Sequence, residues 1–587
     1  MPWTKEWDVA LMEAAVAQRD SSFDDKESLL VRQIGAEYHY HTNLRSTPAH
    51  PTRDSLEYAL FLFEAGGHER RTRAERILTR MLDIQDTEPD SKWYGLWGYY
   101  LEEPASKMSP ADYNWADFNG SLLLLIDFRH GHRLPEMLRS RMREGIRHAA
   151  ISVRRRNVAM TYTNIAVQGT FVLLAAANVL QDAEMRAYAV ARLHRFAATV
   201  DETGSFNEYN SPTYANVTLA NLTRMRMFTP DKDVIGLINA LHDRVWLHLG
   251  KHWHAATAQI AGPMSRCYST DIGAPLWLQK ALAGRLEFAS LDEIRTKRIG
   301  AGEVAMLDYR CPVSLANLFL EPSTPHQHRE LFLNAQSPAE PVQGTTWIEP
   351  AFSLGSVSRG DFWVQRRPLL AFWGDRTRPA RYAQLRFIKD DYDFSSALLA
   401  SVQEGPRILG LVNFRSPGGD KHISLDPIPD GKFQASRMRL RLDLAGEIRD
   451  LKANGNVATM KVGSAFLGIR VLSSMFGKHP QSTWKADHED GLTTLSIDLL
   501  NSTAPVEVNL HDLGDAYLSF ALLMQTKEIT TTDLSQAFEM RVKGATGLKW
   551  GALALNGLTG VHTAPEIDAA IQARINGSAV PVTRLGA

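Results

Sequence analysis

The stretch Thr163–Leu180, TNIAVQGTFVLLAAANVL, decides the architecture of the first half of the chain. Its apolar run from Ile165 to Leu180 contains Gln168 and Asn178. That run is shorter than the roughly 20 residues that a helix needs to span a bilayer. It therefore predicts a helix that is buried inside a globular domain rather than one that lies in a membrane.

Further helical patterns lie on both sides of this stretch, as far as about residue 300. Apolar residues recur there near a period of about 3.6, the spacing of one helix face. Besides 163–180, the expected helices span residues 7–18, 54–64, 73–84, 134–153, 183–200 and 234–249. Long helices joined by short turns predict stacked helical hairpins, which commonly close into an (α/α) toroid.

The second half of the chain changes character from about Gly302. Short β-rich runs appear there, bounded by Gly, Pro, Asn and Asp. The expected strands include residues 362–365, 408–414, 438–444, 466–472, 492–500, 506–510 and 517–524. We therefore predict an α+β multidomain protein, with a toroid over residues 1–300 and an antiparallel β-sandwich over 301–587. Residues 535–587 could form a smaller terminal sheet.

Length and charge limit the classes of function. A chain of 587 residues should hold at least two domains, because single cores stop growing near about 250–300 residues. The formal net charge of −1 argues against a nucleic-acid partner, which would favour a strongly basic surface. The first residues show no charged-then-apolar leader, so a cytoplasmic location is expected, or a periplasmic or secreted one if a leader was removed. No membrane partner is expected, and the sequence does not indicate an oligomeric state.

Three polar segments are expected to form one site. The first is Trp253–Asp271, WHAATAQIAGPMSRCYSTD, which follows a His-rich turn and contains a Gly-Pro pair. The second is Thr161–Asn164, and the third is Phe206–Tyr214, FNEYNSPTY. Together they offer an amide, several phenols, two imidazoles and a guanidinium.

This inventory fits β-elimination at a uronic acid. The C5 proton of a uronate lies next to a carboxylate, so its removal requires that the carboxylate charge be neutralised by an amide or a guanidinium. A base then takes the proton and an acid protonates the leaving oxygen at C4. A tyrosine can do both if the two atoms lie on one sugar face, whereas a histidine suits the anti geometry. A nearby arginine favours the phenolate form of such a tyrosine.

The order of these segments resembles that of the helical-toroid polysaccharide lyases, the heparinase II/III-like and oligo-alginate-lyase-like enzymes. The likeness runs from Asn164 through the loop at 208–214 to the segment ending GPMSRCY at Tyr268, and it covers most of the chain. The later runs at 354–357 and 362–365 resemble the β-sandwich domain of those enzymes.

The resemblance implies a role for each candidate catalytic residue. Asn164 matches the group that neutralises the carboxylate, and Tyr214 matches the acid and could also be the base. Several relatives carry a histidine beside that asparagine, where this chain has Ile165, so the identity of the base stays open. The remaining candidates, one assisting histidine of two and two substrate-binding groups, are His252, His254, Arg266 and Tyr268.

Sugar rings present apolar C–H faces that stack on aromatic side chains, and one dense aromatic cluster, 93–100, lies in a glycine-containing stretch. The expected substrate-binding residues are Trp93, Trp97, Trp115, Asn119, Tyr162, Glu208 and Tyr209. The chemistry requires no cofactor, and a divalent metal, if one binds, would be structural.

The sequence therefore predicts a polysaccharide lyase that acts on an anionic uronate glycan, with rhamnosyl-glucuronate and alginate-type oligomers both open. A glycoside hydrolase on the same toroid is one alternative, and it would need two carboxylates about 5–10 Å apart. Its candidates are Asp112, Asp117, Glu202 and Glu208. A non-catalytic glycan-binding protein, which would tolerate the loss of Tyr214, is the other.

Overall fold

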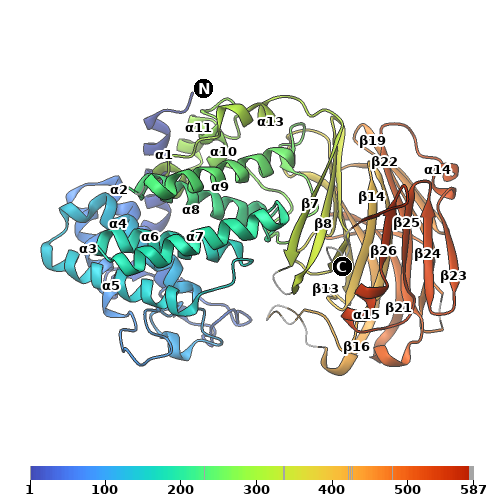
Figure 1. Ribbon diagram of the computed structural model, residues 1–587, viewed down its shortest axis with the longest axis horizontal. Coiled ribbons are helices and arrows are strands. Elements are labelled where there is room, and N and C mark those ends of the chain that lie inside the picture. The colour runs from blue at the N-terminus through green and yellow to red at the C-terminus, as the bar shows by residue number, and fades with distance from the viewer. Residues whose placement is uncertain are drawn as a thin grey trace. The chain divides into compact units, whose positions relative to one another are not determined.

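A computed structural model describes residues 2–580 apart from 231, 335–336, 421, 423–424, 426–427 and 479. The side chains of 334–340 are also outside the described set. Helices occupy the first half of the chain and strands the second, as the blue-to-green and yellow-to-red parts of Figure 1 show. The predicted fold class, helical hairpins followed by antiparallel sheets, is confirmed.

The helical half is built from long antiparallel neighbours. The main helices are α1 (Lys5–Asp20), α2 (Thr52–Ala65), α3 (His68–Asp83), α4 (Asn114–His130), α5 (Glu136–Arg156), α6 (Thr163–Leu180), α7 (Ala183–Thr203), α8 (Pro212–Phe228) and α9 (Lys232–Lys251). Shorter helices follow as α10 (Leu276–Ala281), α11 (Leu291–Thr296), α12 (Gly302–Met306) and α13 (Asn317–Leu320). Because α1 packs against α2 as well as against α11 and α12, the first helix meets the last ones and the ring of hairpins closes.

Helix α6 is the central core helix of this half. It is long and apolar enough to cross a bilayer, yet 83% of it is buried inside the protein. It packs on both α4 and α5. Gly169 allows this close packing, since a Cβ there would lie 2.6 Å from Asp117 Oδ1 and 2.9 Å from Val153.

From β7 (His326–Asn334) onward the described strands form three antiparallel sheets, and three two-stranded sheets lie earlier in the chain. One has the order β10 (Arg359–Asp361), β14 (Ala397–Glu404), β15 (Arg407–Phe414), β22 (Ala516–Gln525), β19 (Ala465–Phe476), β18 (Val457–Val462), β17 (Ile448–Asn454). The second has the order β20 (Lys485–Glu489), β21 (Leu492–Asn509), β16 (Lys432–Ala445), β12 (Arg381–Lys389), β11 (Leu369–Trp373), β9 (Phe352–Val357), β8 (Ser337–Glu349), β7 (His326–Asn334), with β13 (Tyr392–Asp393) beside β12.

The apolar side chains of these two sheets share one core, which includes Phe387, Leu399 and Phe520. This is the arrangement of a β-sandwich, in which alternate residues of each strand point inward. The third sheet consists of β23 (Phe538–Val542), β24 (Ala545–Trp550), β25 (Leu553–Leu558), β26 (Gln572–Ile575) and β27 (Ser578–Val580). Its Trp550 and Leu555 share a second core with Leu409 of the first sheet. Residues 581–587 lie outside the described part of the chain.

The compact units do not follow a single cut in the chain. One unit contains residues 1–199, 216–246 and 274–316, and the other contains 200–215, 247–273 and 317–587. Two segments from the helical half, which carry Tyr214 and Arg266, therefore belong to the same unit as the sheets. The division predicted at residue 300 stays a prediction.

Candidate active site

Tyr214, Arg266 and Tyr268 form one polar cluster within the sheet-containing unit. The hydroxyls of Tyr214 and Tyr268 are 2.6 Å apart. Arg266 Nη2 donates to the hydroxyl of Tyr214 at 3.1 Å and lies 3.4 Å from that of Tyr268. The guanidinium also covers the Tyr214 ring at 5.2 Å. The sequence predicted this meeting of two phenols and a cation, and the structure brings the three together.

The backbone around Arg266 is held on both sides by neighbouring segments. Met264 exchanges two main-chain hydrogen bonds with Arg367, and the Cys267 amide donates to the Gln365 carbonyl at 2.7 Å. The amide of Ser265 donates to the Tyr209 carbonyl at 3.0 Å. Tyr214 stands in the first turn of α8, where its amide donates to the Ser211 hydroxyl. Such anchoring fixes the relative positions of the reactive side chains before a substrate arrives.

Two partners of Arg266, Trp363 and Gln365, were not expected from the sequence. We predicted residues 362–365 as a strand, but the structure has a turn there that carries Trp363 and Gln365. Arg266 Nη2 donates to Gln365 Oε1 at 3.0 Å, and its guanidinium lies 5.1 Å above the Trp363 ring. The prediction was wrong because a short apolar run has the same sequence pattern whether it forms a strand or another buried segment.

The electrostatic environment of the cluster keeps Tyr214 protonated and Arg266 charged. Burial raises the pKa of Tyr214 well above its usual range, the Arg266 charge opposes that shift, and Tyr268 adds to it. Burial lowers the pKa of Arg266, but the two phenols and Glu208 raise it by more. Arg266 Nε is buried and makes no hydrogen bond within the described residues.

The two candidate histidines do not join this cluster. His254 Nε2 must donate to the Glu349 carbonyl at 3.0 Å, which leaves Nδ1 to accept from the Thr257 hydroxyl at 2.8 Å. Burial lowers the pKa of His254 to about 4, so the ring is neutral at physiological pH. Both nitrogens are bonded to the scaffold, and the catalytic role predicted for His254 stays a prediction.

His252 is likewise part of the interior. Its Nδ1 must donate to the His248 carbonyl at 2.8 Å, so its Nε2 accepts from the Tyr209 hydroxyl at 2.8 Å. Both His252 and Tyr209 have an exposed fraction of 0%. Neither side chain reaches the surface in this arrangement, and the catalytic role of His252 and the substrate-binding role of Tyr209 stay predictions.

Glu208 differs from its neighbour Tyr209, because it acts electrostatically on the cluster. It is buried, and its charge raises the pKa of both Tyr214 and Arg266. Glu208 is therefore better described as a counter-ion of Arg266 than as a group that contacts the sugar.

Asn164 and Tyr162 lie in the helical unit, at the start of α6. Asn164 is 3% exposed, and the hydroxyl of Tyr162 accepts from Asn114 Nδ2 at 3.3 Å. The first turn of a helix favours bound anions because its amides have no partner inside the helix. The role predicted for Asn164 fits that position and stays a prediction.

The aromatic cluster of the helical unit is mostly core. Trp97 and Asn119 have an exposed fraction of 0%, and the substrate-binding roles predicted for both stay predictions. Trp97 Nε1 donates to the Met81 carbonyl at 2.8 Å, as a core tryptophan should. Trp115 is half-buried and stacks on Tyr99 with ring centroids 3.8 Å apart, and Trp93 is half-buried beside Lys92.

We expect Trp97→Ala to lower the free energy of unfolding by about 3–5 kcal/mol, because it leaves a large cavity among packed helices. Trp93→Ala, which makes the same substitution at a half-buried position, should lower the free energy of unfolding clearly less. Urea denaturation followed by far-ultraviolet circular dichroism measures both variants. Equal midpoints for Trp97→Ala and the parent chain would show that the indole does not support the core.

The carboxylates proposed for a hydrolase do not form a free pair. Asp112 accepts from the Tyr99 hydroxyl through Oδ2 and from the Asn114 amide through Oδ1. Burial raises the pKa of Asp117 to about 7, and the Arg156 and Arg192 charges oppose the shift. Glu202 is exposed at the end of α7, and Glu208 neighbours Arg266.

A separate groove of about 730 Å³ lies on the helical unit, between the start of the chain, α3 and α5. Its charged side chains are already paired, as Arg80 with Glu27 and Arg141 with Asp83. No cluster of phenols or imidazoles lines it, so it does not offer the chemistry found around Tyr214.

Comparison with other proteins gives a family match over part of the chain and a shared fold. The family model described as "Domain of unknown function (DUF8769)" matches residues 10–280. No curated protein matches the sequence. Among solved structures, a tyrosine-to-alanine variant of the Streptomyces coelicolor A3 chondroitin AC lyase has a TM-score of 0.50 and 11% identity, over 94% of this chain and 85% of that one.

Two further structures are similar at lower scores. The same lyase in complex with chondroitin sulphate has a TM-score of 0.49 and 10% identity, over 94% of this chain and 85% of that chain. Heparinase III has a TM-score of 0.43 and 9% identity, over 98% of this chain and 91% of that chain. The structural neighbours are helical-toroid polysaccharide lyases, and at these identities the likeness establishes a shared fold.

Proposed function

We propose that this protein is a lyase that cleaves a uronate-containing oligosaccharide by β-elimination. The observation that carries the proposal is the contact of Arg266 with Tyr214 and Tyr268, whose hydroxyls are 2.6 Å apart. A buried phenol beside a guanidinium can take a proton from the substrate and return it to the leaving group. The cation can stabilise the negative charge that develops during the reaction. The fold shared with chondroitin AC lyase supports the same class of chemistry.

In the proposed reaction, Tyr214 makes both proton transfers. Its phenolate takes the C5 proton, and the electrons of the broken C–H bond move into the carboxylate to give an enolate-like intermediate. These electrons then form the C4=C5 double bond as the C4–O4 bond breaks. Tyr214 returns its proton to the leaving O4, so the enzyme ends in the state in which it began.

Arg266 stabilises both anions of this sequence. It faces the phenolate through Nη2, and its positive charge also favours the substrate carboxylate. Tyr268 is 54% exposed and hydrogen-bonded to Tyr214, so it links the buried phenol to solvent and can carry away its proton. The stacking of Arg266 on Trp363 keeps the guanidinium in place.

A single tyrosine also limits the choice of sugar. One side chain reaches the C5 proton and O4 only if both lie on the same face of the ring, which gives a syn elimination. Glucuronate and mannuronate present the two groups in this way, whereas their C5 epimers do not. We therefore expect glucuronate- or mannuronate-type oligomers as substrates.

The direct test is a panel of uronate oligosaccharides, followed by ultraviolet absorbance of the conjugated unsaturated product. Elimination predicts a steady rise with glucuronate or mannuronate oligomers and a much slower one with their epimers. New reducing ends without any rise in absorbance would instead demonstrate hydrolysis.

The pH dependence of the reaction follows from the raised pKa of Tyr214. Below that pKa, the ionised fraction of the base grows about tenfold per pH unit, so kcat/KM should rise from about pH 6 to about pH 9 with a slope near one. Arg266→Gln should move the profile further towards alkaline pH, because the guanidinium favours the phenolate. A flat profile across neutral pH would contradict the assignment of Tyr214 as the base.

A further inference from the structure

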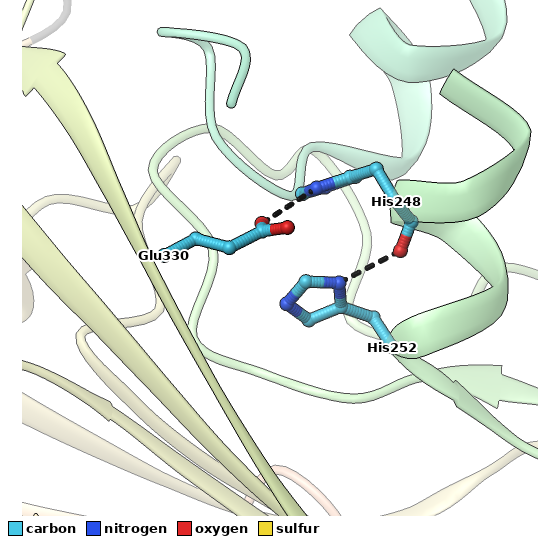
Figure 2. A group of neighbouring side chains, drawn as sticks. All are labelled: His248, His252 and Glu330. Atoms are coloured by element: carbon cyan, nitrogen blue, oxygen red, sulfur yellow. Dashed lines mark hydrogen bonds and ion pairs between the residues drawn. The ribbon is translucent and has the colours of Figure 1, made fainter. Parts of the chain in front are cut away.

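A second cluster of ligating side chains lies in the sheet-containing unit, apart from the phenols. His248 and His252, from the last turn of α9 and the residue after it, meet Glu330 of β7, as Figure 2 shows. One ligating atom from each of the three lies within 4.8 Å of the others. Residues four apart share one face of a helix, so the helical end presents both imidazoles to the strand.

Each histidine has a nitrogen suited to a metal ion. The hydrogen bond from His252 Nδ1 to the His248 carbonyl fixes the tautomer in which Nε2 carries a lone pair. Metal-bound histidines commonly show this bond, since it orients the ring. His248 Nδ1 faces Glu330 at 2.8 Å from Oε2, so it is the nitrogen of this ring that an ion held by all three residues would meet.

The surroundings also resemble those of a metal centre. His328 Nε2 lies 2.7 Å from Glu330 Oε1, and the Ser205 hydroxyl donates to Glu330 Oε2 at 3.2 Å, so both carboxylate oxygens are oriented. Tyr209 stacks on Phe332 with ring centroids 4.5 Å apart, which gives the cluster an apolar wall. Ligand orientation and exclusion of water are the two features that a second shell supplies.

We propose that His248, His252 and Glu330 bind one divalent zinc ion. Two imidazoles and a carboxylate form a three-ligand set that zinc favours over calcium or magnesium. Binding requires that the Tyr209 hydroxyl release His252 Nε2, and the Thr346 side chain is a second hydrogen-bond partner of Tyr209.

The site links to the phenol cluster through Tyr209. Its carbonyl accepts from both the amide and the hydroxyl of Ser265, at 3.0 and 2.9 Å, next to Arg266. The ion would therefore stabilise the segment that carries Arg266, as a structural metal does. The inference does not depend on the proposed elimination, because its readout is metal content.

The test uses the full chain without an affinity tag, freed of metal with a chelator and then mixed with zinc. We expect one zinc per chain after gel filtration, measured by elemental mass spectrometry, and a higher melting temperature. His252→Gln and Glu330→Gln should each weaken zinc affinity by about 100-fold or more, since loss of second-shell partners alone costs about 10–100-fold. His488→Gln, the same change at an exposed histidine, should keep the full zinc content.

Cobalt substitution of the parent chain supplies a readout that needs no variant to fold. Tetrahedral cobalt bound by nitrogen and oxygen absorbs visible light strongly, and added zinc should abolish the band. The proposal is overturned if the parent chain retains no zinc, or if folded Glu330→Gln retains as much as His488→Gln does.

Discussion

Tyr214→Phe should lower kcat/KM for the elimination by roughly 10⁴-fold, the upper end of the range for general acid–base catalysis, because one phenol serves both proton transfers. The substitution removes a single oxygen atom from a ring that stays packed beside Tyr268 and Arg266. The fold should therefore persist while the reaction stops. Initial rates of unsaturated product on the best uronate oligomer measure the loss.

A matched control distinguishes the loss of proton transfer from the general effect of removing a tyrosine hydroxyl. Tyr188→Phe, on α7, also removes one hydroxyl and one hydrogen bond, that to Asn157 at 2.9 Å. Its rate should equal that of the parent chain. If Tyr214→Phe keeps more than a tenth of the parent activity, the proton must travel by another group, and the assignment of Tyr214 fails.

Arg266→Gln should lower kcat/KM by about 10²–10³-fold, as does removal of one preorganised donor from an oxyanion site. The guanidinium contacts Tyr214, Tyr268 and Gln365 through one nitrogen, and its Nε remains unused. Loss of the positive charge removes the electrostatic stabilisation of both the phenolate and the substrate carboxylate. Steady-state kinetics at saturating and limiting substrate should show losses in kcat as well as in kcat/KM.

Arg266→Lys tests whether charge alone suffices. Lysine keeps the positive charge but lacks the planar fork that stacks on Trp363 and donates in several directions. The kcat/KM of Arg266→Lys should be about tenfold higher than that of Arg266→Gln, since a point charge in the same place still favours the phenolate. Parent-like activity in Arg266→Gln would show that Arg266 only supports the loop.

The helical half was predictable because the periodic apolar patterns of its helices extend over many residues. The run Thr163–Leu180 contains its own boundaries, and α6 has the same limits. The strand at 408–414 was likewise placed within one residue of β15. The runs at 492–500 and 506–510 proved to be parts of one strand, β21, because the pairing with β16 is irregular between them and the exposed residues there look like a break in a hydrophobic pattern.

The site was only partly predictable. Arg266 and Tyr268 were found because they stand two residues apart in a segment rich in side chains of known chemistry, and Tyr214 because the loop at 208–214 resembles that of the helical-toroid lyases. The burial of His254 and Trp97 was not foreseen, since a polar or amphipathic residue looks the same in sequence whether it faces substrate or a buried carbonyl. Glu330 escaped notice because it lies far along the chain from His248 and His252, and only folding joins them.

The most direct test of the central claim is the mass of the product formed by the parent chain in heavy-oxygen water. Elimination predicts a new non-reducing end that is one water lighter than a hydrolysis product, with no oxygen taken from the solvent. A product that contains solvent oxygen and has the full mass would show that the chain is a hydrolase, and it would contradict the mechanism built on Tyr214 and Arg266.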